Sequence, residues 1–175
     1  MITRNFVFFL LIISPNIALS QQVKADSGKI IIQEVQSEEI EEEVPPPPPD
    51  LKSNFKSLND WLNNICDHEK PKKSIEEYNF GLFEAPNEYI LFLVGVNKYN
   101  EGTNRSRTSI EFKPTKMYFK LPQKEYANLS REMLLDKLTN QLKDLTGTKK
   151  FNTSFLAKAK TITFESNGQK IWSRD

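Results

Sequence analysis

The chain has 175 residues, of which 24 are Lys or Arg and 23 are Asp or Glu, so its formal charge near pH 7 is +1. That length allows one ordinary domain with additional segments. The chain has one Cys and one His. This excludes an internal disulfide and a zinc site of the Cys₄ or Cys₂His₂ kind.

Residues 1–20 have the parts of a secretory signal peptide. Arg4 supplies the positive charge, residues 6–13 form the apolar core, and Ala18 and Ser20 provide the small side chains that precede a cleavage site before Gln21. A membrane anchor is the alternative, but this apolar run is far shorter than the ~20 residues that span a bilayer. We therefore expect an exported protein without stable membrane insertion, periplasmic in a bacterium or secreted by a eukaryotic cell.

Residues 21–50 differ from the rest of the chain in composition. They hold eight acidic and two basic residues, no aromatic residue, and five consecutive prolines at 45–49. Such a segment buries too little apolar surface to offset its chain entropy, so we expect a disordered, acidic, proline-rich linker. The prolines should form a polyproline II rod of roughly 15 Å. Alternatively, the β-prone run at residues 29–35 adds to an exposed sheet edge, of this chain or of a partner.

Residues 51–175 are expected to form one domain with two long helices. Apolar residues at steps of three and four predict the first helix over residues 51–68, with Asp50 as its N-cap. The second helix should begin after Ser130, which precedes a leucine-rich stripe, and should end at Gly147.

Alternating or continuous apolar runs predict the strands. They lie at residues 78–84, 89–99, 108–121, 161–165 and 169–172. Pro114 interrupts the third strand, Gly95 in the second indicates a bulge or close packing, and Asn167-Gly168 is typical of a hairpin turn. These elements predict an α+β fold with the order α-β-β-β-α-β-β, in which two helices cover one face of an antiparallel sheet of about five strands.

Basic residues gather in and around the third predicted strand and form the candidate partner-binding face. They are Arg105, Arg107, Lys113, Lys116 and Lys120, with Tyr118 and Phe119 interleaved. We expect a protein partner with an acidic surface rather than a nucleic acid. The alternative is a solvated strand whose lysines protect a sheet edge from unwanted pairing.

The sequence contains no arrangement typical of an active site. Cys66 and His68 are two apart on a helix and point in different directions, and Glu76 and Glu77 point to opposite faces of a strand. We therefore expect no catalytic residue, no metal and no cofactor; an enzyme using Glu111 or His68 is the alternative. Cys66 lies on the apolar side of its helix, where we expect it to pack in the core, with a disulfide to another chain as the alternative.

Three stretches resemble small bacterial α+β domains of the toxin-immunity type. They are YNFGLFE, EYILFLVGVNKY and KMYFKLP before a leucine-rich helix, within residues 75–145. The resemblance implies a non-enzymatic protein that binds and blocks a toxin. Such domains are usually cytosolic, so the signal peptide is a departure, and the matching residues are packing residues that transfer no site.

These observations predict an exported, non-catalytic binding protein, in one version a periplasmic immunity protein. The alternative is a structural or envelope-associated interaction module. Residues 21–50 carry a formal charge of −6 and residues 51–175 carry +6. Opposite charges of this size attract at low salt, so the acidic segment is expected to shield the basic face until a partner competes for it.

Overall fold

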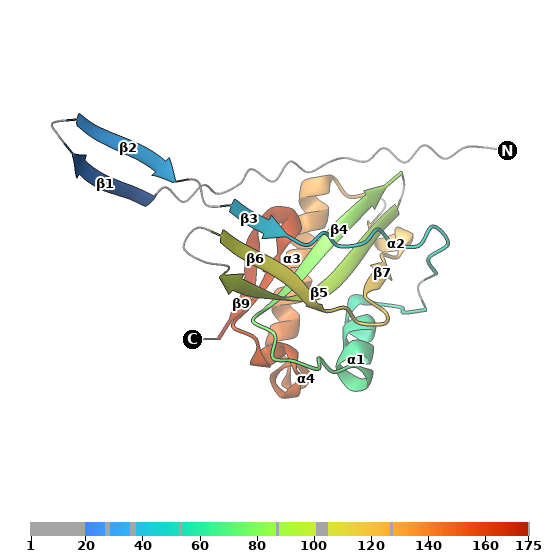
Figure 1. Cartoon of the computed structure of the whole chain (residues 1–175). Coiled ribbons are helices and arrows are strands. Elements are labelled where there is room, and N and C mark those ends of the chain that lie inside the picture. The colour runs from blue at the N-terminus through green and yellow to red at the C-terminus, as the bar shows by residue number, and fades with distance from the viewer. Residues whose placement is uncertain are drawn as a thin grey trace. The chain divides into compact units, whose positions relative to one another are not determined.

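The computed structural model describes residues 20–26, 29–35, 38–52, 54–86, 88–100, 105–126 and 128–174 (Figure 1). The described residues divide into two compact units. The smaller unit lies within residues 20–43 and 98–109, and the larger one within residues 44–97 and 110–174. The expected signal peptide, apart from Ser20, lies outside the described residues.

The smaller unit contains three strands from the segment expected to be a linker. Strands β1 (Ser20–Asp26) and β2 (Lys29–Val35) form an antiparallel pair. Strand β3 (Glu38–Glu41) pairs in parallel with the first half of β6 (Arg105–Phe112). The β-prone run at residues 29–35 is thus β2, which pairs with β1. The segment that joins the edge of β6 is instead the acidic strand β3. The boundary between linker and domain stays a prediction.

The main sheet has six strands in the order β3-β6-β5-β4-β8-β9, and a short strand pairs with β5 outside this path. The other strands of this sheet are β4 (Glu77–Ala85), β5 (Glu88–Asn100), β7 (Tyr118–Lys120), β8 (Thr161–Phe164) and β9 (Gln169–Ser173). The α+β class is confirmed, and strands lie at four of the five predicted positions: β4, β5, β8 and β9. Gly168 has a φ of 68° in the turn before β9, where its missing side chain allows the left-handed conformation.

The expectation of a wholly antiparallel sheet is wrong, because β8 pairs with β4 in parallel, as β3 does with β6. The chain between β7 and β8 is long and helical, so it can cross over and return in the same direction. The third predicted strand becomes two strands, β6 and β7, on either side of Pro114. The indole N–H of Trp61 donates to the carbonyl of Lys116 in this break, at 2.7 Å.

Among the residues that the structure describes, four α-helices accompany the sheet. They are α1 (Leu58–His68), α2 (Gln123–Tyr126), α3 (Arg131–Thr146) and α4 (Lys149–Thr153). The predicted start of the first helix at Leu51, capped by Asp50, is wrong. The N-cap is Ser57, whose hydroxyl accepts from the Asp60 amide at 3.1 Å. Leu51 instead closes a turn, because its amide donates to the Pro48 carbonyl.

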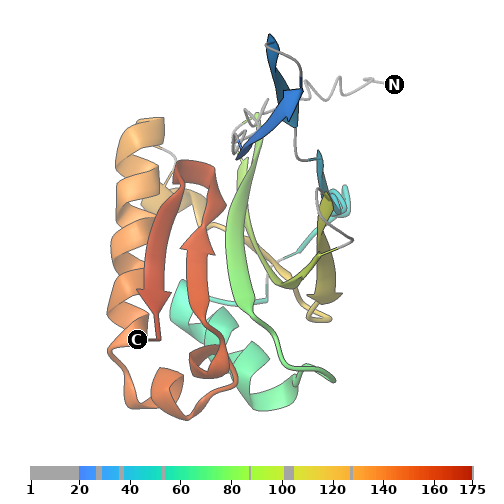
Figure 2. The ribbon, with the colours of Figure 1, turned by 60° about the vertical axis from the view of Figure 1, so that its left-hand side comes forward.

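The larger unit has a first core that joins α1, α3, β4 and β5. Trp61 and Leu138 from the helices are fully buried in it beside Phe80 and Leu93 from the strands. Figure 2 shows α3 alongside β9. Cys66 packs against this core as expected, half-buried and without a disulfide.

Every second residue in the middle of β5 belongs to a second core. Successive strand residues point to opposite faces, and Phe92, Val94 and Val96 cluster with Met117 away from the first core. The continuous apolar run of β5 is therefore explained by burial on both faces. Gly95 marks close packing, since a Cβ there would lie within 3.0 Å of Tyr78, Phe112 and Ile75 atoms.

Candidate functional site

The face of the sheet that carries the second core is bordered by partly buried aromatic side chains. The ring of Phe83 lies 5.2 Å from that of Phe92 and 6.3 Å from that of Tyr118, measured between centroids. Val44 and Ile110 complete the cluster. We call Phe83, Phe92 and Tyr118 the aromatic face.

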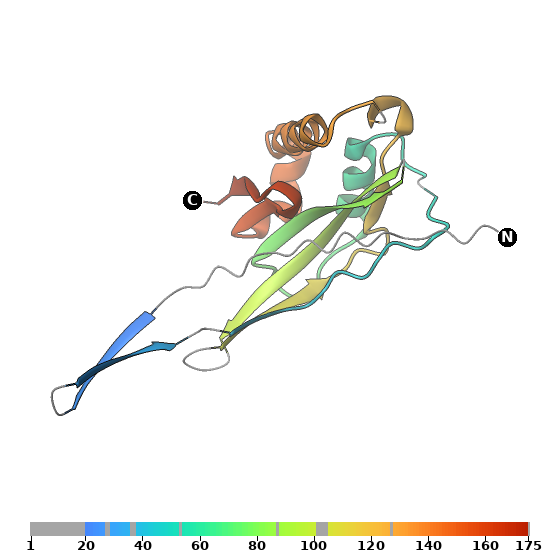
Figure 3. The same cartoon turned by 90° about the horizontal axis from the view of Figure 1, so that it is seen from above.

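Residues 44–49 cover part of the aromatic face. Figures 2 and 3 show this segment on the side of the sheet away from α3. Val44 packs against the second core, and the Tyr118 hydroxyl donates to the Pro45 carbonyl at 2.5 Å. Burial raises the pKa of Tyr118, so its hydroxyl keeps its proton and remains a donor at neutral pH.

The burial of this segment has a period of three residues. Val44 and Pro47 are half-buried, whereas the neighbouring prolines 45, 46, 48 and 49 are exposed. A polyproline II helix has three residues per turn, so residues i and i+3 lie on the same side. The segment therefore meets the sheet as such a helix would, with one side in contact and its other prolines in solvent.

A second site lies at the edge of β6, within the smaller unit. Glu38 is the register partner of Arg105, and Glu41 that of Thr108. The pairing continues past β3, because the Glu42 amide donates to the Thr108 carbonyl at 3.2 Å. The Ser109 hydroxyl also donates to the Glu42 carboxylate, at 3.3 Å.

The five predicted partner-binding residues are divided between the two units. Arg105 and Arg107 belong to β6 in the smaller unit, and the other three belong to the larger unit. Lys116 is exposed, with its Nζ 5.3 Å from the centre of the Phe55 ring. Lys120 is partly buried in an ion pair with Glu88 at 2.8 Å.

Lys113 is exposed beyond the end of β6. Its even spacing from Arg105 and Arg107 therefore does not continue along one strand. Because the strand ends before Pro114, the lysines that follow are placed by the turn and by β7 rather than by the face of one strand. Arg105 and Arg107 are paired in register with residues of the acidic strand β3.

The other chemical candidates have structural partners. Glu76 pairs with Lys160 at 2.5 Å, and Glu111 pairs with Lys73 at 2.8 Å. His68 is exposed, and its Nδ1 lies 2.9 Å from the carbonyl of Asn64, one helical turn earlier. Within the described part of the chain, no three His, Cys, Asp or Glu residues are grouped so that they could hold a metal ion.

Cys66 lies beside the first core. Burial raises the pKa of its thiol, while a hydrogen bond with Ser154 and the charge of Lys150 act in the opposite direction. The thiol therefore remains protonated near neutral pH, which disfavours it as a nucleophile.

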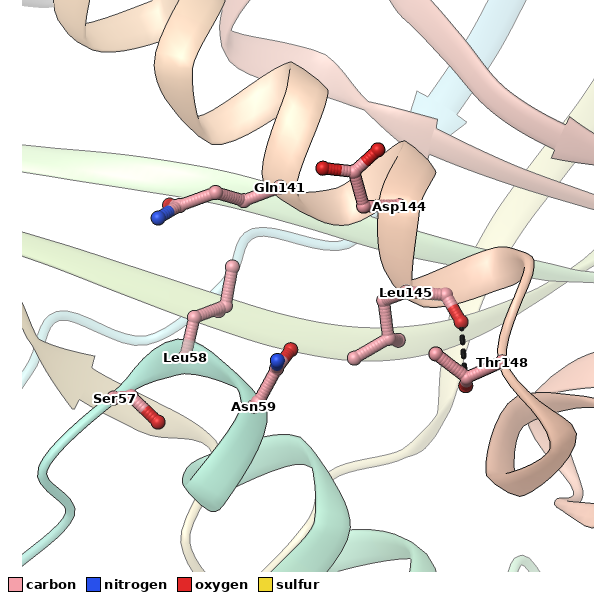
Figure 4. A pocket seen from close by; sticks show the side chains of 7 residues that line it. All are labelled: Ser57, Leu58, Asn59, Gln141, Asp144, Leu145 and Thr148. Carbon is pink, nitrogen blue, oxygen red and sulfur yellow. Dashed lines mark hydrogen bonds between the residues drawn. The ribbon is translucent and has the colours of Figure 1, made fainter.

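A shallow pocket of about 220 Å³ lies between the start of α1 and the end of α3 (Figure 4). It is lined by Ser57, Leu58, Asn59, Gln141, Asp144, Leu145 and Thr148. Ser57 caps α1, Gln141 accepts from Tyr126, and Thr148 donates to the Leu145 carbonyl. These bonds hold the two helix ends, and none of the predicted site residues reaches the pocket.

Comparison of the chain with protein-family models, with curated proteins and with solved structures gave no significant match. The site is therefore interpreted from its own residues. Among the residues that the structure describes, no helix is both long enough and apolar enough to cross a membrane.

The aromatic face was only partly visible in the sequence. In the sequence Tyr118 stands between lysines, whereas Phe83 and Phe92 are packing residues of two predicted strands. The signal that was available is the uninterrupted apolar run of β5, which indicates that both faces of this strand need a cover. Its second cover includes a proline-rich segment outside the predicted domain.

Proposed function

We propose that the chain is an exported, non-catalytic binding protein whose β6 edge accepts an extended acidic segment of a partner protein. In the absence of the partner, its own β3 occupies this edge. The proposal takes α1 and α3 together as the cover of the sheet face that carries the first core. It assigns binding to the edge of β6. The immunity version specifies the partner as a toxin in the periplasm; it rests on the resemblance of the three packing stretches.

One observation carries the proposal: the parallel register of Glu38–Glu41 beside Arg105–Thr108. An extended segment that joins a sheet edge gains main-chain hydrogen bonds, which give affinity without requiring a deep pocket. The acidic composition of β3 and the two arginines of β6 add charge complementarity, which favours correct encounter and register.

The strand β3 is also suited to being replaced. It contains four residues, so few ladder hydrogen bonds hold it. A partner segment with more pairing residues would gain bonds that β3 lacks. Until a partner binds, β3 protects the edge of β6, which would otherwise be open to unspecific pairing.

The proposal is tested with the full-length chain and a synthetic peptide of residues 37–43. In the chain, Glu38, Glu39, Glu41 and Glu42 are changed to Lys, which sets like charges beside the arginines of β6. We expect this variant to bind the acidic peptide, by calorimetry at low salt, about tenfold more tightly than the native chain, because the native edge is already occupied.

Two controls make the result specific for strand addition. A peptide with Ile40→Pro keeps the charge but loses a backbone donor, and it should bind more weakly. Adding Arg107→Glu to the lysine variant should also weaken binding, and more so at low salt than at ~0.15 M. Equal binding of the native and proline peptides, or no binding to the folded variant, contradicts the proposal.

A further inference from the structure

We propose that the aromatic face is a binding site for polyproline segments, which the chain's own residues 44–49 occupy. By the same contacts, the face would bind a proline-rich segment of a partner in the polyproline II conformation. This inference depends on residues of the larger unit only. It is independent of the acidic strand at the β6 edge.

The first argument is the polar contact. Proline has no amide hydrogen and a polyproline II helix has no internal hydrogen bonds, so its carbonyls accept from whatever donor is near. The Tyr118 hydroxyl donates to the Pro45 carbonyl at 2.5 Å. A tyrosine hydroxyl at the rim of an aromatic surface is suited to this task, because its ring contacts the ligand's apolar side while its hydroxyl fixes the register.

The second argument is the shape of the surface. The Phe83 ring lies 5.2 Å from that of Phe92 and 6.3 Å from that of Tyr118, and Phe92 and Tyr118 are register partners on β5 and β7. The Phe92 ring lies over Gly81, where a Cβ would come within 2.4 Å of two of its ring atoms. The missing side chain at Gly81 thus lets this ring lie close to β4, and the aromatic cluster forms without a bulky residue beneath it.

The third argument is the periodicity of the bound segment. Val44 and Pro47 are half-buried and the prolines between and after them are exposed, as expected for a three-residue turn with one side on a surface. A turn closed by the Leu51 amide and the Pro48 carbonyl, at 3.1 Å, ends the segment. Five prolines in a row restrict the free chain to this conformation, so less entropy is lost on binding.

Because the bound segment and its site belong to one chain, the segment acts at a high effective concentration. A partner must compete with it, so the native chain should bind proline-rich peptides weakly. Loss of the chain's own prolines should open the site.

The test uses the full-length chain with P45G, P46S, P47G, P48S and P49G, and a peptide of residues 44–50. Titration followed by calorimetry and by the NMR signals of the aromatic rings should show binding about tenfold tighter than to the native chain. Adding Tyr118→Phe should weaken this binding about fivefold, the effect of one lost hydrogen bond.

Tyr126→Phe is the matched control, since Tyr126 also loses a hydroxyl hydrogen bond, to Gln141 in the larger unit, but does not belong to the aromatic face. It should leave peptide binding unchanged. A folded proline-free chain that does not bind the peptide, or that binds a Gly-Ser peptide equally well, overturns the proposal.

A second measurement needs no proline-free variant. In the native chain, Tyr118→Phe should accelerate hydrogen exchange of the Leu51 amide, which donates to the Pro48 carbonyl, several-fold, whereas Tyr126→Phe should not. If Tyr118→Phe leaves this amide unchanged, the hydroxyl does not hold the segment and the inference is wrong.

Discussion

The phenyl ring of Phe92 on β5 lies over Gly81, its register partner on β4. A Cβ at residue 81 would come 2.1 Å from Cζ of Phe92 and 2.4 Å from Cε1. These distances are far below van der Waals contact, so the ring takes the space that any other residue at 81 would fill. This cross-strand pair connects the stability of the sheet centre with the shape of the aromatic face.

Gly81→Ala should therefore destabilise the protein, because Phe92 must leave its position or the strands must separate. We expect a loss of about 1–3 kcal/mol in the free energy of unfolding, typical of overpacking in a core. Urea unfolding measures it. Gly147→Ala is the control: a Cβ there meets only the Asp144 carbonyl, at 3.5 Å, and its stability should stay within about 0.5 kcal/mol of the native value.

Ser57→Ala should shorten or loosen the start of α1, since the Asp60 amide loses its acceptor. The expected cost is about 1 kcal/mol, measured by thermal or urea unfolding. Asp50→Ala should have almost no effect, because the helix starts at Leu58. An equal cost for both changes would indicate that Asp50 also supports this end of the helix.

Trp61→Phe should cost more than Trp172→Phe. Trp61 is fully buried, stacks on Phe119 at 5.6 Å between centroids, and donates to the Lys116 carbonyl at 2.7 Å. Its loss removes packing volume and leaves a carbonyl without its donor, at a cost of roughly 2–4 kcal/mol. Trp172 is only partly buried.

Tryptophan fluorescence of the same two variants tests the burial of Trp61. The Trp172→Phe chain, which retains Trp61, should emit at shorter wavelength than the Trp61→Phe chain, because the indole of Trp61 is fully excluded from water. Emission at the same wavelength in both variants would contradict the burial of Trp61.

The protein should lose stability at alkaline pH. Burial raises the pKa of Tyr78 above its ordinary value of 10.0 and that of Cys66 above 9.0. As the pH rises, these groups ionise in the unfolded chain before they ionise in the folded one. The stabilisation is complete below the unfolded values and is lost as the pH passes from these values through the folded ones.

Tyr78→Phe should make the urea midpoint less sensitive to pH. The comparison requires midpoints at about pH 7 and about pH 10.5, on either side of the ordinary tyrosine value. Between about pH 6 and pH 7, Tyr78 is ionised in neither the folded nor the unfolded chain. The difference in urea midpoint between the native chain and the variant should therefore be constant there. An unchanged alkaline loss in the variant would show that Tyr78 does not contribute to it.

The ion pair between Lys120 and Glu88, at 2.8 Å, decides how available Lys120 is to an acidic partner. A double-mutant cycle with alanine at both positions should give a coupling of about 0.2–1 kcal/mol, which disappears near 1 M salt. The pair of Lys73 and Glu111, whose lysine is more exposed than Lys120, provides a comparison. A coupling that survives high salt would mean that Lys120 serves the fold and not binding.

The sequence determined those features of the fold that depend on interactions between residues close together in the chain. Ser130 caps α3, Gly147 ends it, and Gly168 occupies the left-handed turn before β9; each depends on neighbours within a few residues. The apolar runs likewise located the strands, because burial requires apolar side chains wherever the sheet is covered. The local pattern failed at the start of α1, where Asp50 and Ser57 are both suitable caps and distant contacts select one.

Tertiary structure decided the relations between distant residues. The parallel return of β8 beside β4 depends on the path of the chain through α3, which no local pattern encodes. The break at Pro114 was visible, but the bond from Trp61 to Lys116 that holds it joins residues 55 apart in sequence. The basic residues of the candidate site likewise do not share one strand, since β6 ends at Phe112 and a turn precedes β7.

The candidate sites show this division most clearly. Composition alone indicated an acidic, proline-rich segment with a charge opposite to that of the domain. Only the folded chain shows which surfaces meet that segment: Arg105–Thr108 beside the acidic strand, and Tyr118 beside Pro45. The physical reason is that charge and chain stiffness are properties of a segment, whereas a binding surface arises when folding brings side chains from separate strands together.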